Sequence, residues 1–322
     1  MSLPAAALTA ALLLAGPAVA RLEAELSADH MVLDAALRGP LLLAATQSGH
    51  LDAFDWRERR RLAPLLVIDA GEGEFPPSVR CVDVSPSGTR AVAAASDDRL
   101  RVWSFGADDR ASGPRQLDLP RAATACRFLD DERVLMGYMT GEVSLVEVTN
   151  GRERFRRQLE YDPVYVLAPS PDGRRVAVAF RSSRIQLIDA ASGATVRVLR
   201  GPRDSIYGLA WLGEQRLAAA GKDKRLLVWN LAAPESAPRV VYQGDRYITA
   251  LAADRPRGRL AFTLEGERIG VVEVASGLVT HVLEGHTAPI QVLLFADQGR
   301  SLVSAGNDAR VLVWDVSPGS AQ

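Results

Sequence analysis

A short pattern rich in aliphatic residues returns at nearly constant spacing through most of the chain. It is clearest where it ends in tryptophan, in Leu100–Trp103, Leu226–Trp229 and Val311–Trp314. Its last residue falls at positions 54, 103, 146, 188, 229, 272 and 314, so the copies are 49, 43, 42, 41, 43 and 42 residues apart. A period of 20–50 residues is typical of repeat architectures. We therefore interpret the 322 residues as one repeat array rather than as two separate domains.

Each copy divides into four short strands separated by turn residues. In the fourth repeat the expected strands are Val164–Ala168, Arg175–Phe180, Arg184–Asp189 and Thr195–Leu199. Short strands bounded by Gly, Pro, Ser and Asp at regular intervals are typical of all-β folds. The 26 glycines and 18 prolines are then turn residues distributed through a single domain.

These repeats resemble the WD40 family of β-propellers, and the best match is the last repeat, where Gly285–His286 precedes Trp314–Asp315. The resemblance implies a hydrogen-bonded structural network within that blade, formed by His286, Ser304, Asp308 and Trp314. An Asp also stands six residues before the Trp in two other repeats, as Asp97 with Trp103 and Asp223 with Trp229. Other repeats depart from this pattern, with Thr140, Ser182 and Gly266 at the Asp position.

The same architecture follows from burial. A four-stranded sheet that is apolar on both faces must bury both, and radial packing against two neighbours does so while exposing only short edges. We therefore predict an all-β fold, a seven-bladed propeller of four-stranded antiparallel blades over residues 21–317, with a short tail at 318–322. The last repeat lacks a fourth strand, so the alternating segment Leu22–Leu26 is expected to complete it and close the ring.

Residues 1–20 are predicted to be a secretory signal peptide cleaved after Ala20. The apolar run Ala5–Ala15 is followed by Gly16–Pro17 and by the small-x-small motif Ala18–Ala20, which is the pattern of such peptides. The run is shorter than the roughly 20 residues that a membrane-spanning helix needs. A periplasmic or secreted protein without a transmembrane segment after cleavage is therefore expected. The alternatives are an uncleaved anchor and a cytoplasmic protein.

The amino-acid composition limits which partners, metals and catalytic sites are expected. The 38 basic and 39 acidic side chains give a net charge of −1, which disfavours nucleic acid as a partner because domains that bind it are strongly basic. Two cysteines and four histidines, without a Cys-x-x-Cys or His-Glu-x-x-His motif, predict neither a metal nor a cofactor. A catalytic triad of His286, Ser304 and Asp308 is less favoured than the structural network, since no Gly-x-Ser-x-Gly elbow occurs. No catalytic residue is predicted.

Cys81 and Cys126 lie in the first strands of neighbouring repeats. Alignment of these strands offsets the two thiols by one residue, which places them on opposite faces of their sheets. Because opposite faces of adjacent blades meet, one expectation is an interblade disulfide in an oxidising compartment. The other is two separate buried thiols.

One end of the channel is the predicted partner-binding face, since the resemblance implies that partners bind where the inner strands begin. Arg80, Tyr165, Tyr207 and Gln291 each directly follow the first apolar residue of an inner strand. Tyr and Arg are enriched at binding hot spots. The predicted face comprises Arg80, Asp98, Tyr165, Arg181, Tyr207, Lys222, Lys224, Tyr247 and Gln291, with Glu265 beside them. The alternative is that these residues only cap the channel.

Two basic runs, Arg57–Arg61 and Arg152–Arg157, follow the third strands of their repeats. Charged side chains protect outer edge strands from pairing with other chains. We interpret both runs as solvated outer edges, and the alternative is a patch for an anionic partner.

The predicted function is a non-catalytic scaffold that binds another protein or protein complex. The resemblance to exported WD40-like proteins implies an accessory role beside a respiratory or redox enzyme system. A propeller enzyme of the lactonase or dehydrogenase type is the alternative from another class, and it would need carboxylates or metal ligands converging at the channel. A cytosolic WD40 scaffold is the third reading. Fold by itself does not decide among them.

Overall fold

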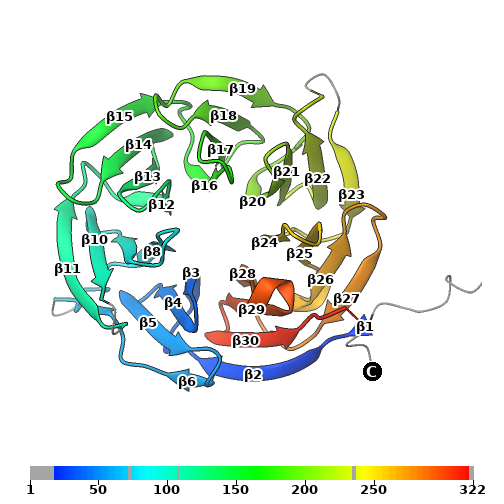
Figure 1. The fold of residues 1–322 in the computed structure, drawn as a ribbon, viewed down its shortest axis with the longest axis horizontal. Helices are drawn as coiled ribbons and strands as arrows, with labels where there is room; N and C mark the ends of the chain where they lie inside the picture. Colours follow the sequence, from blue (N-terminus) through cyan, green and yellow to red (C-terminus); the bar gives the residue numbers. More distant parts are fainter. Residues whose placement is uncertain (1–17, 72–73, 107–108, 234–236, 319–322) are drawn as a thin grey trace, which may run out of the picture.

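The computed structural model of the chain describes residues 18–71, 74–106, 109–233 and 237–318. Seven antiparallel sheets stand around a central axis like the blades of a propeller, and each runs from an inner strand beside the axis to an outer strand at the rim (Figure 1). The prediction of an all-β, seven-bladed propeller is confirmed.

The first four blades follow the chain in order, each with its strands in sequence from the inside out. Blade 1 consists of β3 (Val32–Arg38), β4 (Leu41–Thr46), β5 (His50–Asp55) and an outer strand in two pieces, β6 (Arg60–Arg61) and β7 (Leu66–Val67). Blade 2 consists of β8 (Val79–Val84), β9 (Arg90–Ala95), β10 (Arg99–Phe105) and β11 (Ala111–Asp118). Blade 3 consists of β12 (Ala123–Phe128), β13 (Arg133–Tyr138), β14 (Glu142–Glu147) and β15 (Glu153–Gln158). Blade 4 consists of β16 (Val164–Pro169), β17 (Arg175–Phe180), β18 (Ile185–Asp189) and β19 (Thr195–Leu199).

Two further blades continue in the same order, and the last one takes its outer strand from the beginning of the chain. Blade 5 consists of β20 (Ile206–Gly213), β21 (Arg216–Gly221), β22 (Arg225–Asn230) and β23 (Arg239–Gln243). Blade 6 consists of β24 (Leu251–Asp254), β25 (Arg259–Thr263), β26 (Ile269–Glu273) and β27 (Val279–Leu283), with a 3-10 turn at Glu265–Glu267. Blade 7 consists of β28 (Ile290–Ala296), β29 (Ser301–Gly306), β30 (Arg310–Asp315) and β2 (Arg21–Ser27), with a 3-10 turn at Asp297–Gly299.

The strand β2 closes the ring. It pairs antiparallel with β30, from Arg21 opposite Asp315 to Ser27 opposite Arg310. Glu25 accepts two hydrogen bonds of 2.8 Å from the guanidinium of Arg310. Main-chain hydrogen bonds therefore join the first and last blade strands of the chain, and the prediction that an N-terminal strand completes the last blade is confirmed.

A two-residue strand precedes β2. This strand, β1 (Ala18–Val19), pairs in parallel with β27 at the rim of blade 6, and Ala20 is buried beside Trp314. The predicted signal peptide otherwise falls on residues 1–17, which lie outside the described residues. The predicted cleavage after Ala20 would separate β1 from β2 and stays a prediction, as do the domain boundaries.

The hydrophobic core is divided among the seams between blades. Each of seven buried clusters in the described residues combines two neighbouring blades. Between blades 2 and 3, for example, Leu100 and Val102 pack with Val134 and Met136. Neighbouring blades approach each other closely near the axis. A Cβ atom added to Gly208 would lie 2.5 Å from the Cβ atom of Leu251 in the next blade. No blade can therefore bury its own faces alone.

One seam carries a covalent link. Cys81 in β8 and Cys126 in β12 form a disulfide whose Cα atoms are 5.7 Å apart. The bridge joins the inner strands of blades 2 and 3, and both residues are buried. Of the two expectations for these cysteines, the structure contains the interblade disulfide.

Replacement of both Cys81 and Cys126 by alanine is expected to lower the free energy of unfolding. The bridge spans 45 residues of sequence, and closing a loop of that size in the unfolded chain contributes about 2–4 kcal/mol to stability. Guanidinium denaturation of the oxidised protein measures the loss. Reductant should shift the wild-type midpoint in the same direction and leave that of the double variant in place. A variant as stable as the oxidised protein would contradict the expectation.

Candidate interaction site at the channel mouth

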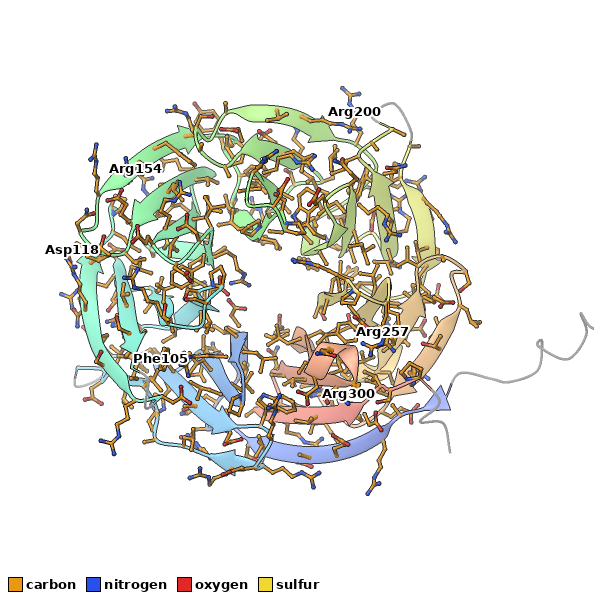
Figure 2. The ribbon with its side chains drawn as sticks, viewed as in Figure 1. Phe105, Asp118, Arg154, Arg200, Arg257 and Arg300 are labelled. Atoms are coloured by element: carbon orange, nitrogen blue, oxygen red, sulfur yellow. A yellow bond between two sulfur atoms is a disulfide. The ribbon has the colours of Figure 1, made fainter. Side chains whose placement is uncertain are left out.

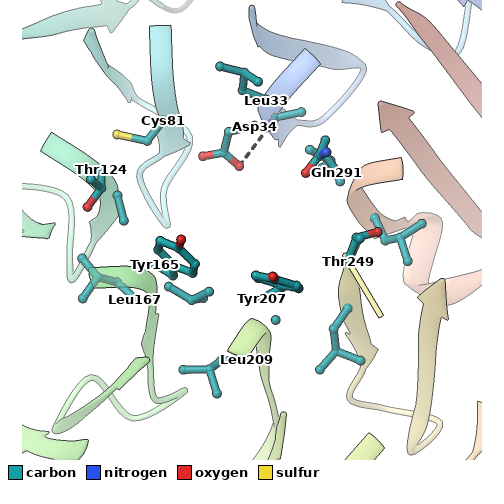
Figure 3. Close-up of a pocket in the computed structure, with 18 of the residues that line it drawn as sticks. Leu33, Asp34, Cys81, Thr124, Tyr165, Leu167, Tyr207, Leu209, Thr249 and Gln291 are labelled. Carbon is teal, nitrogen blue, oxygen red and sulfur yellow. Dashed lines mark hydrogen bonds between the residues drawn. The ribbon is translucent and has the colours of Figure 1, made fainter. Parts of the chain in front are cut away.

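A cavity of about 620 Å³ opens along the axis at one end of the ring. We call this end the mouth face; it is the end at which the inner strands begin and the turns between second and third strands lie. All seven blades line the cavity with residues of their inner strands or of the segments that lead into them. Figure 3 shows Tyr165 and Tyr207 side by side in this cavity, with Asp34, Thr249 and Gln291 on other walls.

A repeated backbone irregularity sets the lining. In six blades the pairing between the inner strand and the second strand shifts register around one residue near the start of the inner strand. The residues at these shifts are Leu33, Arg80, Thr124, Tyr165, Tyr207 and Gln291. All of them line the cavity. Because a β-bulge bends its strand and re-aims a side chain, the bulges direct these side chains toward the axis instead of into the seams.

Three of the nine residues of the predicted face are tyrosines. The rings of Tyr165 and Tyr207 stack with their centroids 6.0 Å apart and their planes 27° from parallel. Burial, followed by the neighbouring Tyr165, raises the pKa of Tyr207, so its hydroxyl keeps its proton at neutral pH. Tyr247 lies just before the inner strand of blade 6, half exposed, with Lys222 Nζ 6.0 Å from its ring centroid.

The predicted residues fall into two groups. Five line the cavity, namely Arg80, Tyr165, Tyr207, Tyr247 and Gln291. The other four, Asp98, Arg181, Lys222 and Lys224, lie outside it, in the turns between second and third strands, where Glu265 also lies.

Backbone conformation or an ion pair accounts for each of the four residues in these turns. Asp98 and Lys224 have φ angles of 60° and 66° and occupy the left-handed position of their hairpins. Arg181 pairs with Asp162 at 3.2 Å, and Lys222 pairs with Asp204 at 3.5 Å. These four residues surround the cavity without entering it.

The wall beside blades 1 to 3 contains a charged pair that the sequence patterns did not single out. Arg127 in β12 donates two hydrogen bonds to Asp34 in β3, at 2.8 and 3.2 Å. Asp34 also accepts from the backbone amides of Ala35 and Val82, at 3.0 and 3.1 Å. Its carboxylate is thus fully engaged, and the pair links the inner strands of three blades.

Asp83 lies next to this pair, in β8. Its carboxylate accepts a 2.7 Å hydrogen bond from the backbone amide of Phe128. Burial raises the pKa of Asp83 to about 6, and the nearby Arg127 opposes that rise. A charged residue inside an otherwise apolar inner strand, as at Asp34, Asp83 and Arg127, is the signal that would have identified this group.

Two threonines complete the ring of lining residues and were also missed. The Thr124 hydroxyl donates to the carbonyl of Val164 in the next blade at 2.7 Å. Thr249 makes the equivalent bond, at 2.6 Å, to the carbonyl of Ile290. Both stand one position after the first apolar residue of their inner segments, the offset that identified Tyr165 and Tyr207, so the same rule would have found them.

The predicted network of the last repeat is present as a continuous chain of hydrogen bonds. Trp314 Nε1 lies 2.8 Å from Ser304 Oγ, Ser304 Oγ 2.7 Å from His286 Nε2, and His286 Nδ1 2.8 Å from Asp308. Since Trp donates only, the protons are ordered: Trp314 donates to Ser304, Ser304 to neutral His286, and His286 to Asp308. The His286 and Ser304 side chains are buried, so this set is part of the blade and not a catalytic triad open to substrate.

The two related Asp–Trp pairs are arranged differently. Asp97 binds Arg101 at 3.1 Å, and Asp223 binds Arg225 at 2.7 Å, so in both repeats an arginine takes the carboxylate that His286 takes in the last blade. Trp103 is buried, and Trp229 donates through Nε1 to the carbonyl of Arg200 at 3.1 Å. Neither repeat has the Gly-His pair that the complete network needs.

Among the residues that the structure describes, one group of potential metal ligands lies near the mouth face, at the outer part of blade 1. Ligand atoms of Asp29, His50 and Asp52 lie within 4.8 Å of one another. Arg61 donates to Asp29 at 2.5 Å and to the buried Asp52 at 3.2 Å. The guanidinium thus contacts both carboxylates and compensates one of their two negative charges, and the arrangement is that of an ion-paired cluster. His281 lies in β27, and His286 belongs to the network of the last blade described above.

The two basic runs lie at the rim, where Figure 2 labels Arg154 at the outer edge of the ring. The first run supplies β6, and the second supplies β15. Five of their eight arginines contact carboxylates; for example, Arg61 pairs with Asp29, and Arg156 with Glu153. Solvated outer edges describe these contacts better than an open anion-binding patch. In a separate observation, none of the helices among the described residues is long and apolar enough to span a bilayer.

The buried network predicts a pH dependence. Burial lowers the pKa of His286 against the opposing effect of Asp308, while unfolded His has a pKa of about 6.5. Below about pH 6.5, His286 therefore binds a proton more readily in the unfolded chain than in the folded blade. The contribution of neutral His286 to the free energy of unfolding is fully present above about pH 6.5 and is lost as the pH falls.

The variant His286→Gln should lower the free energy of unfolding by about 1–3 kcal/mol at pH 7, because buried partners lose their hydrogen bonds. The deficit relative to wild type should shrink between pH 7 and pH 5, as measured by urea denaturation. His281, whose pKa burial also lowers, contributes equally to both proteins and cancels in the difference. A deficit that stays constant with pH would contradict the assignment.

Three of the repeats match a known protein family. Three segments match the family described as WD domain, G-beta repeat, at residues 72–104, 193–230 and 277–315. These segments contain the three repeats that end in Trp103, Trp229 and Trp314.

Similar curated proteins align with longer parts of the chain. Meiotic fizzy-related protein 1 of Schizosaccharomyces pombe is 28% identical over 134 residues, which are 42% of this chain and 32% of that protein. Telomerase protein component 1 of Rattus norvegicus is 25% identical over 258 residues, 76% of this chain and 10% of that protein. WD repeat-containing protein SL1-17 of Schistosoma mansoni is 22% identical over 235 residues, 72% of this chain and 77% of that protein.

The chain spans about a third or less of the length of the first two relatives. The matched repeats, the network of the last blade and the closed ring all point to the same kind of fold. The chain forms a β-propeller of seven blades, and three of its repeats match the WD domain, G-beta repeat family.

Proposed function

We propose that this protein is a non-catalytic scaffold that binds another protein on its mouth face. WD40 proteins typically bind other proteins or complexes. The observation that carries the choice of face is the distribution of exposed hydrophobic side chains. Large exposed apolar groups gathered on one surface mark interaction sites.

Twelve large hydrophobic side chains are exposed among the described residues. Six stand at the mouth face or in the loops that lead to it: Met31, Phe75, Met139, Tyr161, Tyr165 and Tyr247. The other six stand on outer strands or directly before one: Leu22, Val67, Val196, Val198, Val240 and Leu278. The exposed aromatic side chains of this set are all in the first group, and Phe75 is 98% exposed. Aromatic anchors of this kind dominate the energetics of protein interfaces.

The cavity chemistry favours binding over catalysis. An enzyme of the lactonase or dehydrogenase type would need carboxylates or metal ligands that converge on bound substrate. Asp34 is the one carboxylate among the described residues that line the cavity. Because all its acceptor capacity is taken by Arg127, Ala35 and Val82, Asp34 is poorly placed to act as a base or a ligand.

We also propose that the protein acts outside the cytoplasm. The Cys81–Cys126 bridge supports this, since disulfides persist in oxidising compartments and are rare in the cytosol. The predicted signal peptide is consistent with the bridge. In such a compartment a respiratory or redox enzyme system is one kind of partner, and a cytosolic scaffold is the competing proposal.

Substitution of Tyr165, Tyr207 and Tyr247 by alanine should weaken partner binding by at least roughly tenfold, because truncation of hot-spot tyrosines costs more than 1 kcal/mol each. Affinity capture from a periplasmic extract, with the tagged full-length chain as bait and mass spectrometry as readout, identifies the partner. Titration of the purified partner then gives the Kd of each variant.

The matched control carries Val196, Val198 and Leu278 changed to alanine, which removes exposed apolar groups from outer strands only. It should bind like wild type. Equal binding by the tyrosine variant, or loss in the control alone, would contradict the proposed face. Recovery of the bait solely from the cytosol would contradict export.

A further inference from the structure

The mouth cavity contains hydrogen-bond donors that have no partner. Among the described residues, no hydrogen bond or ion pair engages the guanidinium of Arg80 or the hydroxyls of Tyr165, Tyr207 and Tyr247. All four groups line the same cavity. Arg80 is exposed at the bulge of β8, and a guanidinium stays protonated at any physiological pH.

The one carboxylate among the described lining residues, by contrast, is occupied. Asp34 accepts four hydrogen bonds from Arg127 and from two backbone amides. The hydroxyls of Thr124 and Thr249 are held by carbonyls of neighbouring blades. Among the described lining residues, the ionised acceptor is therefore taken, whereas the guanidinium of Arg80 and three tyrosine hydroxyls can donate to a ligand.

The charges of the lining point the same way. Two cations and one carboxylate line the cavity within the described residues: Arg80, Arg127 and Asp34. Arg127 pairs with Asp34 and also lies near Asp83, whereas no carboxylate among the described residues pairs with Arg80. At the edge of the cavity, Lys222 and Asp204 form a second neutral pair at 3.5 Å.

We propose that the mouth cavity receives a carboxylate side chain, Asp or Glu, from an extended acidic segment of the partner protein. Arg80 binds the carboxylate in a charge-assisted pair, and tyrosine hydroxyls donate to it from the other side of the channel. The inference rests on the proposed function and specifies the chemistry of the partner. A protein segment fits better than a free acid because exposed Phe75, Met139 and Tyr161 extend the contact surface beyond the cavity.

The test begins with selection of binders from a random 12-residue peptide library displayed on phage, with the full chain as target. Enriched sequences should share an acidic residue. One such peptide is then synthesised with a fluorescent label, together with its matched form in which the acid is changed to the corresponding amide. Fluorescence anisotropy gives the Kd of both peptides for wild type, Arg80→Gln and Arg80→Glu.

The acid-to-amide change in the peptide and Arg80→Gln should each weaken binding roughly ten- to a hundredfold, the effect of one hydrogen bond to a charged group. The two changes together should cost little more than either alone, because they remove the same interaction. The matched control is Arg216→Gln. Arg216 is also exposed and without a partner among the described residues, but it begins a second strand at the opposite end of the ring, so its loss should leave the Kd unchanged.

Two results would separate this inference from the proposed function. Peptides that lose affinity with the tyrosine variant but carry no acidic residue, or that bind Arg80→Glu as tightly as wild type, would overturn the carboxylate assignment and leave the mouth face as the docking site. Peptides whose Kd changes neither with the tyrosine variant nor with the Arg80 variants would contradict both the carboxylate assignment and the proposed docking face. A library that yields no binder would do the same.

Discussion

Closure of the ring is the constraint on which the rest of this structure depends. Each blade is apolar on both faces, and each of the seven described core clusters lies between two blades. An open array would leave two such faces in water. The pairing of β2 with β30 removes both free ends at once. It places Leu26 and Ala24 in the same cluster as Val311 and Val313, against blade 1. The first blade strand in the sequence is therefore structurally part of the last blade.

Closure also creates the site. Inner strands that converge on one axis bring seven equivalent positions together, and the bulges turn the side chains at six of them inward. The side chains at these positions contribute little to the hydrophobic core, since neighbouring residues of the inner strands pack the seams between blades. They can therefore hold Tyr, Arg and Gln without cost to the core. Blades 1 to 3 use the same region differently: the Asp34–Arg127 pair links the inner strands of blades 1 and 3, and the disulfide joins those of blades 2 and 3.

Much of the fold was predictable from the sequence, because repetition turns weak local signals into a strong one. The four strands expected in the fourth repeat agree with β16 to β19 to within one residue at each end. Three matching repeats carry Trp at the same place, and the degenerate repeats could be aligned to them by spacing alone. The partner of the last blade could be inferred because one strand was missing and one was left over.

Site residues could be predicted only where the position of a residue within its own strand places it at the channel. The offset from the first apolar residue was enough for Arg80, Tyr165, Tyr207 and Gln291. It was not enough for the Asp34–Arg127 pair, because a salt bridge between residues 93 positions apart depends on the angle between blades. The cysteine pairing was undecided for the same reason. A one-residue offset identifies the faces on which the thiols lie, but not the distance between two sheets.

Deletion of residues 21–28 from the full chain tests the role of closure most directly, by thermal unfolding followed by circular dichroism. It removes β2, its main-chain pairing with β30 and the burial of Leu26. A cooperative transition at a Tm lower by about 10 °C or more is expected, given several kcal/mol of lost hydrogen bonding and burial. Glu25→Gln, which removes only the exposed ion pair with Arg310, should cost less than about 1 kcal/mol. An unchanged Tm in the deletion variant would contradict the account, because the ring would then be stable without the strand that closes it.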